Sequence, residues 1–130
     1  DINYSEGVFI AKESVQTTLL HVRLNKAVPV FSFDREMLLE KLSHLAGFHD
    51  IDFPEYPDFS DDFYVRGNNP KKVRAFFTAE LISFFSAYGF YHIMCNGNEL
   101  IVRQFLRPAS PAEATAMIAF GLALKEKIDG

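Results

Sequence analysis

The sequence predicts a domain of the α+β class, in which an antiparallel or mixed sheet is covered on one face by about three helices. Three observations lead to this prediction. Strand-like runs fill the first 33 residues, helical patterns with recognisable caps follow, and the connections between elements are short. The regular strand–helix alternation of a doubly wound nucleotide-binding fold is missing from the pattern.

Length and composition indicate one self-sufficient core. The chain has 130 residues, of which 48% are hydrophobic and 23% are charged. It contains 14 Phe and 5 Tyr but no Trp, and we expect Phe to dominate the core because Phe is among the residues most often buried. Since no repeat, low-complexity tract or linker divides the chain, we expect residues 1–130 to form a single soluble domain.

Residues 1–33 are expected to form strands. The run from Val15 to Leu24 is rich in β-branched and apolar residues. Pro29 interrupts it, because proline cannot donate a ladder hydrogen bond, and residues 30–33 then resemble a short edge strand.

A helix and a loop-rich segment are expected next. Asp34 is a suitable N-cap, because a carboxylate accepts from the free amides of a first turn, and Gly47 is a suitable end for that helix. Residues 48–69 contain two prolines and many acids, which predicts an extended, packed loop that can begin with a short strand, and a further short strand at 63–66.

Residues 70–88 are expected to be helical, with Gly89 ending the helix. Asn69 can cap the helix, and Pro70 takes the first helical position, where its missing N–H costs nothing. Thr78 can cap a fresh start, so we expect two helical pieces with a bend near Phe77.

The last part of the chain is expected to contain a hairpin and a helix. Asn96-Gly97 favours a type I′ turn, which would join residues 90–95 to 99–105 as a β-hairpin in the C-terminal half. Ser110 and Glu113 form a capping box that begins the final helix. We expect one packing side on this helix, made of Ala114, Met117, Ile118, Gly121, Leu122 and Leu124.

Several function classes are disfavoured. The net charge is -4 and basic residues are scattered, which argues against nucleic acid as a partner. Cys95 is the only cysteine and lies in an apolar run, so we expect a buried hydrophobe rather than a nucleophile. The sequence contains no run of 18 apolar residues, so we do not expect this segment to insert into a membrane. Phosphate-loop, dinucleotide-loop, nucleophile-elbow and zinc patterns are not found.

An acidic segment is the one cluster of residues suited to metal chemistry. Oxygen ligands in an extended loop suit divalent cations, and Asp50 and Asp52 would project to the same side of an extended chain, with His49 beside them. The alternative is that these acids cap turns and keep the surface polar. The segment comprises His49, Asp50, Asp52, Glu55, Asp58, Asp61 and Asp62.

Arg66 is a second candidate. We expect it either to form a structural ion pair with Asp50, Asp52 or Asp58, or to bind an anionic ligand. Asp50, Asp52 and Arg66 are therefore the candidate ligand-binding residues, and His49, Asp50 and Asp52 are the candidate metal ligands.

One block of the chain resembles a family of uncharacterised bacterial proteins. The resemblance lies in Asp50-Ile51-Asp52-Phe53, Pro57-x-Phe59-Ser60, Tyr64-x-Arg66-Gly67 and Val73-Arg74-x-x-Phe77-Thr78. Members typically carry a hydrophobic N-terminal anchor before a soluble domain. The resemblance implies a membrane-tethered full-length protein, on a side that the sequence does not assign, and it implies no activity.

The sequence favours a non-enzymatic module that binds a protein or a small-molecule ligand and needs no cofactor. The alternative is a metal-dependent hydrolase centred on the acidic segment at residues 49–62, with a divalent metal as cofactor. Cellular location stays unassigned.

Overall fold

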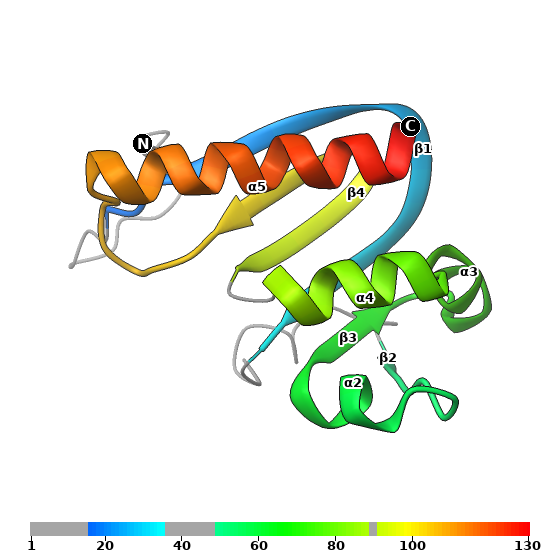
Figure 1. Cartoon of the computed structure of the whole chain (residues 1–130). Coiled ribbons are helices and arrows are strands. Elements are labelled where there is room, and N and C mark those ends of the chain that lie inside the picture. The colour runs from blue at the N-terminus through cyan, green and yellow to red at the C-terminus, as the bar shows by residue number, and fades with distance from the viewer. Residues whose placement is uncertain (1–15, 36–48, 89–90) are drawn as a thin grey trace, which may run out of the picture.

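The computed structural model describes residues 16–35, 49–88 and 91–130 (Figure 1). Within these ranges a four-stranded antiparallel sheet is combined with four helices, which confirms the α+β class. The strand segments expected before Gln16, the helix expected between Asp34 and Gly47, and the residue expected to end the helix at 70–88 lie outside the described residues.

The sheet has the strand order β2-β3-β1-β4. Its two long strands are neighbours, and the two short strands lie beyond β1. In Figure 1, α5 runs along the part of the sheet built by β1 and β4, whereas α3 lies at the other end, against β2 and β3. The strands are β1 (Leu19–Asp34), β2 (His49–Ile51), β3 (Tyr64–Gly67) and β4 (His92–Arg103).

The hairpin predicted at Asn96-Gly97 is wrong. β4 runs unbroken through this pair and follows β1 along its whole length, from Leu19 opposite Arg103 to Phe33 opposite Ile93. A type I′ turn needs positive φ at both central residues, and among the described residues only Gly97 has one, at 71°. Gly97 instead marks an irregularity in the ladder, where the register between β1 and β4 shifts.

The interruption predicted at Pro29 is also wrong, because β1 continues through it as a strand of 16 residues. The register with β4 shifts between Arg23 and Val28 and again between Val28 and Phe31. These irregularities place Pro29 where the ladder is already broken, so its missing N–H removes no regular hydrogen bond.

Three of the four described helices begin where local capping chemistry predicts. The exception is α2, which lies in the segment expected to be a loop, so that expectation is wrong for residues 57–62; its N-cap Tyr56 makes no side-chain cap hydrogen bond. Asn69 Oδ1 accepts from Lys72 N at 3.2 Å, and the predicted bend is confirmed, since Thr78 Oγ1 accepts from Leu81 N at 3.2 Å and starts a new helix. The capping box of Ser110 and Glu113 is present. The helices are α2 (Pro57–Asp62), α3 (Pro70–Phe76), α4 (Ala79–Tyr88) and α5 (Pro111–Asp129).

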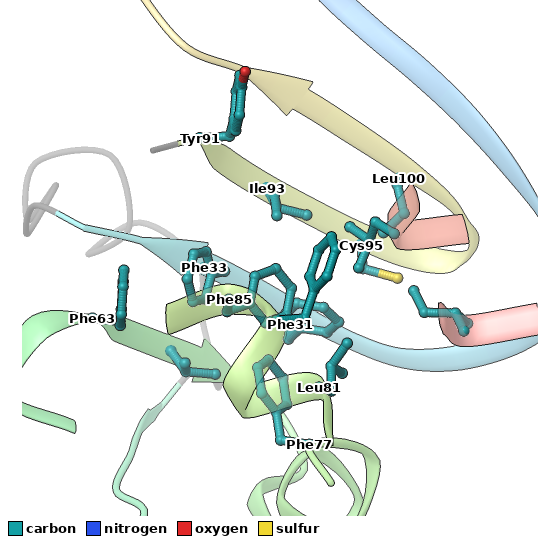
Figure 2. Close-up of a cluster of buried hydrophobic side chains, with 14 of the residues drawn as sticks. Phe31, Phe33, Phe63, Phe77, Leu81, Phe85, Tyr91, Ile93, Cys95 and Leu100 are labelled. Atoms are coloured by element: carbon teal, nitrogen blue, oxygen red, sulfur yellow. The ribbon is translucent and has the colours of Figure 1, made fainter. Parts of the chain in front are cut away.

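The core is built mainly from Phe, as predicted. Figure 2 shows Phe31 and Phe33 of β1 meeting Phe77 and Phe85 from the helical side. The rings of Phe33 and Phe85 stack with centroids 4.3 Å apart, and Phe31 meets Phe77 edge-on at 5.2 Å. Cys95 is fully buried in the same cluster, where burial raises the pKa of its thiol to about 12. The core therefore fixes the central strand β1 against α3 and α4.

Candidate functional site

The structure brings two of the predicted site residues together. Asp50 of β2 pairs in register with Arg66 of β3, and Arg66 Nε lies 2.8 Å from Asp50 Oδ1. One of the two expectations for Arg66, an ion pair with an acid of this segment, is thus observed. The Asp50 side chain is 63% exposed, whereas that of Arg66 is 15% exposed, so the contact lies at the edge of a largely buried guanidinium.

Asp52 and His49 do not join this pair. The backbone oxygen of Asp52 accepts from Arg74 Nε at 3.0 Å, and its side chain is exposed. His49 is exposed at the start of β2, opposite Gly67. Within the described ranges, no three His, Cys, Asp or Glu side chains lie close enough together to hold a metal ion.

The signature block at residues 50–67 has a clear structural role. Ile51, Phe53 and Phe59 are buried in the core, alternating with exposed acids. The Ser60 hydroxyl accepts from Phe53 N at 2.8 Å and donates to Phe53 O at 3.3 Å, which fastens the loop to α2. This part of the resemblance therefore describes how the segment folds.

The sheet carries a group of polar side chains that we call the polar face, comprising Ser32, Asp34, Asp50, Tyr64, Arg66 and His92. Across the strands, Asp50, Arg66 and Ser32 are in register, and Asp34 is opposite Tyr64. Their strand positions alternate with those of core residues such as Phe33 and Val65, so they project from the opposite side of the sheet.

Asp34 is the buried acid of the polar face. Its side chain is 6% exposed, and Asp34 Oδ1 lies 2.5 Å from His92 Nδ1, so the carboxyl group and the imidazole are joined by a short hydrogen bond. The sequence predicted Asp34 as a helix cap, and the residues that it would cap lie outside the described ranges. Its partner in the structure is His92, across β1 and β4.

Ser32 and Arg66 contain the polar atoms of this face that lack a hydrogen bond. Ser32 is 3% exposed, and its Oγ has no hydrogen-bond partner in the described chain. Arg66 Nε and Nη1 are buried as well; Nε makes the ion-pair contact with Asp50, but neither nitrogen forms a hydrogen bond there.

A second feature is an apolar groove between α4 and α5, with a volume of about 790 Å³. Its floor is aromatic: the Phe120 ring stacks on Tyr91 at 4.3 Å and on Phe84 at 5.7 Å. At one end Lys127 Nζ and Glu80 Oε2 form an ion pair at 3.0 Å. We call this the α4/α5 groove, lined by Glu80, Ser83, Phe84, Tyr88, Tyr91, Ala116, Ala119, Phe120, Ala123 and Lys127.

Apolar side chains are also exposed on a side of α5 that does not line the groove. Met117, Gly121 and Leu124 are buried as predicted, but Ile118 is 48% exposed and Leu122 is 61% exposed, so the predicted packing side is wrong for these two. The helix has apolar residues on all sides, and a single buried face cannot accommodate all of them. This was visible in the sequence, since no charged residue occurs between Ala114 and Leu124, and such a helix is typically covered on more than one side.

No protein-family model, no curated protein and no solved structure matches this chain. The resemblance to the bacterial family thus stays an expectation from the sequence. None of the helices in the described residues is long and apolar enough to cross a membrane.

Proposed function

We propose that this domain is a non-enzymatic protein-binding module, and that the α4/α5 groove receives the apolar face of a helix from a partner protein. The observation that carries the proposal is the apolar groove itself, where exposed Ala116, Ala119 and Ala123 of α5 lie beside the rings of Phe84 and Phe120. Contiguous exposed apolar surface of this kind marks interaction sites.

The side chains along the groove suit a helix as occupant. Ala112, Ala116, Ala119 and Ala123 follow one another at intervals of four, three and four residues, so they line one side of α5. Small side chains at this spacing let a second helix approach closely, and Phe84 and Phe120 offer an apolar floor for its larger side chains.

The charge distribution has the form of an interface. Interface centres are depleted of charge and are surrounded by a polar rim. Here the uncharged stretch of α5 ends at ion pairs on both sides, Arg107 with Glu113 at 2.8 Å and Lys127 with Glu80 at 3.0 Å. A membrane surface is a poorer occupant, because interfacial helices carry a polar face rich in Lys and Arg, and this chain has a net charge of -4.

The sequence resemblance supports a further part of the proposal. The module would belong to a bacterial protein that a separate segment tethers to a membrane, and it would present the groove to a protein on the same side. No cofactor is needed for such a role.

Selection of helical peptides tests the proposal. Peptides chosen from a display library for binding to the domain are titrated into isotope-labelled protein, and we expect the largest NMR shift changes at Phe84, Ala119 and Phe120. Ala119→Arg places a charged side chain in the groove and should weaken binding more than tenfold. Ile101→Arg is the matched control, because Ile101 is 39% exposed on β4 and does not line the groove.

Two results would contradict the proposal. In one, the selected helices bind elsewhere and Ala119→Arg binds them as wild type does. In the other, only small apolar compounds fill the groove, which would replace a protein partner by a small-molecule ligand.

A further inference from the structure

We propose that the polar face holds a second binding site, in which Arg66 and Ser32 bind a carboxylate or phosphate group and Asp50 competes with that ligand for Arg66. This site is on the sheet, away from the α4/α5 groove, and does not depend on the proposed protein-binding function.

Register brings the two binding residues together. Ser32 of β1 is directly opposite Arg66 of β3. Opposed residues of antiparallel strands project from the same face of the sheet, with their Cβ atoms about 5 Å apart. The hydroxyl and the guanidinium can therefore act on one ligand group.

The unsatisfied atoms on this face have a common chemistry. Arg66 Nε and Nη1 and Ser32 Oγ are buried without a hydrogen bond to the described residues, and all three can donate. Folded proteins satisfy about nine in ten buried polar groups. Arg66 Nη1 and Ser32 Oγ have no acceptor, and Arg66 Nε faces only the exposed Asp50 carboxylate at 2.8 Å. Such donors are complementary to a group with several acceptor oxygens, which is the chemistry of a carboxylate or a phosphate.

The charges nearby leave Arg66 available. The carboxylate of Asp34 is already matched by His92, at 2.5 Å. Asp50 contacts Arg66 through Nε, but its side chain is 63% exposed, so solvent screens the attraction. The Asp50 carboxylate occupies the position from which a ligand carboxylate would contact Arg66 Nε. A ligand that also contacts Arg66 Nη1 and Ser32 Oγ would make more hydrogen bonds than Asp50 does.

Because Asp50 competes with the ligand, replacing Asp50 and replacing the binding residues should change the affinity in opposite directions. Acetate and inorganic phosphate are titrated separately into the intact domain, and binding is followed by NMR shifts of Ser32 and Arg66. Asp50→Asn removes the competing charge and should strengthen binding about tenfold, whereas Ser32→Ala and Arg66→Lys should weaken it by a similar factor. The stronger of the two probes identifies the ligand group as carboxylate or phosphate.

Asp58→Asn is the matched control, since it changes the net charge equally from an exposed position in α2 and should leave affinity unchanged. Equal strengthening by Asp50→Asn and Asp58→Asn would overturn the proposal, because it would show a general charge effect. So would the absence of saturable binding of both anions to wild type and to Asp50→Asn. The melting temperature of each variant shows whether it is folded. If Arg66→Lys does not fold, the comparison of Asp50→Asn with wild type still tests the proposal.

Discussion

Asp34 and His92 form a hydrogen-bonded pair between the central strand β1 and the edge strand β4, with Oδ1 and Nδ1 2.5 Å apart. The carboxylate is 6% exposed and the imidazole is 20% exposed. A buried carboxylate is costly unless it is paired, so the imidazole is what makes Asp34 tolerable at this position.

Replacing His92 by Phe should therefore destabilise the domain strongly. The change leaves the Asp34 charge buried without its partner, and the free energy of unfolding should fall by about 3 kcal/mol. Urea denaturation measures it. The double variant Asp34→Asn with His92→Phe should lose less than the sum of the single changes, because the unpaired charge is gone.

His21→Gln is the control for that experiment. His21 lies on β1 and contacts Glu99 of β4 at 3.4 Å, but its side chain is 56% exposed. Its replacement should therefore lower the free energy of unfolding by less than about 1 kcal/mol. Equal costs for His21→Gln and His92→Phe would show that burial of the Asp34 pair is unimportant.

Gly67→Ala should destabilise the domain through backbone crowding. A Cβ at Gly67 would lie 2.8 Å from Val30 O and 3.0 Å from Val73 Cγ2, so β3 or α3 would have to move. Overpacking of this kind costs about 1–3 kcal/mol. Thermal or urea unfolding measures the change.

Gly97→Ala is the contrasting variant. Its Cβ meets nothing within 4 Å, but φ is 71°, which costs an L-residue about 1–2 kcal/mol. Gly97→Asn should recover part of that loss, because Asn tolerates positive φ, whereas Gly67→Asn should be worse than Gly67→Ala. The reverse order would contradict both explanations.

Acid should weaken the start of α5. The hydrogen bond from Arg107, together with that from Ser110 N, lowers the pKa of Glu113 from 4.5 to about 2. Because the folded-state pKa is the lower one, this stabilisation is present above about pH 4.5 and is lost as the pH falls toward 2. Glu113→Gln should thus be less stable than wild type at pH 7, and the difference should close in that window. Urea midpoints at a series of pH values measure it, and a difference independent of pH would contradict the assignment.

The thiol of Cys95 should report unfolding. It is fully buried, and burial raises its pKa to about 12, so the native protein holds an inaccessible, protonated thiol at neutral pH. A thiol-specific colorimetric reagent should react in seconds in guanidinium and only slowly without it. Rapid, stoichiometric reaction of the native protein would show that the core around Cys95 opens readily.

The features visible in the sequence are the local ones. A cap depends on residues within one helical turn, so Asn69, Thr78 and the pair of Ser110 and Glu113 were predictable. The α+β class also followed from local patterns. Phe was expected in the core because its burial depends on the chemistry of the side chain more than on its neighbours.

The features that the sequence missed depend on distant residues. Gly97 does take the positive φ expected of a hairpin, but whether its flanks pair with each other or with β1 is decided by a strand far away in sequence. Asp34 and His92 are 58 residues apart, and only the register of β1 and β4 makes them partners. In α5, the exposure of Leu122 depends on how many sides of the helix the sheet can cover.

The pairing of β1 with β4 also sets the order in which the domain can assemble. β1 is among the first described parts of the chain to leave the ribosome, yet its longest partner ends at Arg103 and its cover, α5, ends at Asp129. Val22 of β1 lies opposite Leu100 and close to Gly121, so residues from the last third of the sequence bury it from solvent. Contacts between residues so far apart in the sequence form slowly during folding. We therefore expect a newly made chain to expose β1 to chaperones until synthesis is nearly complete.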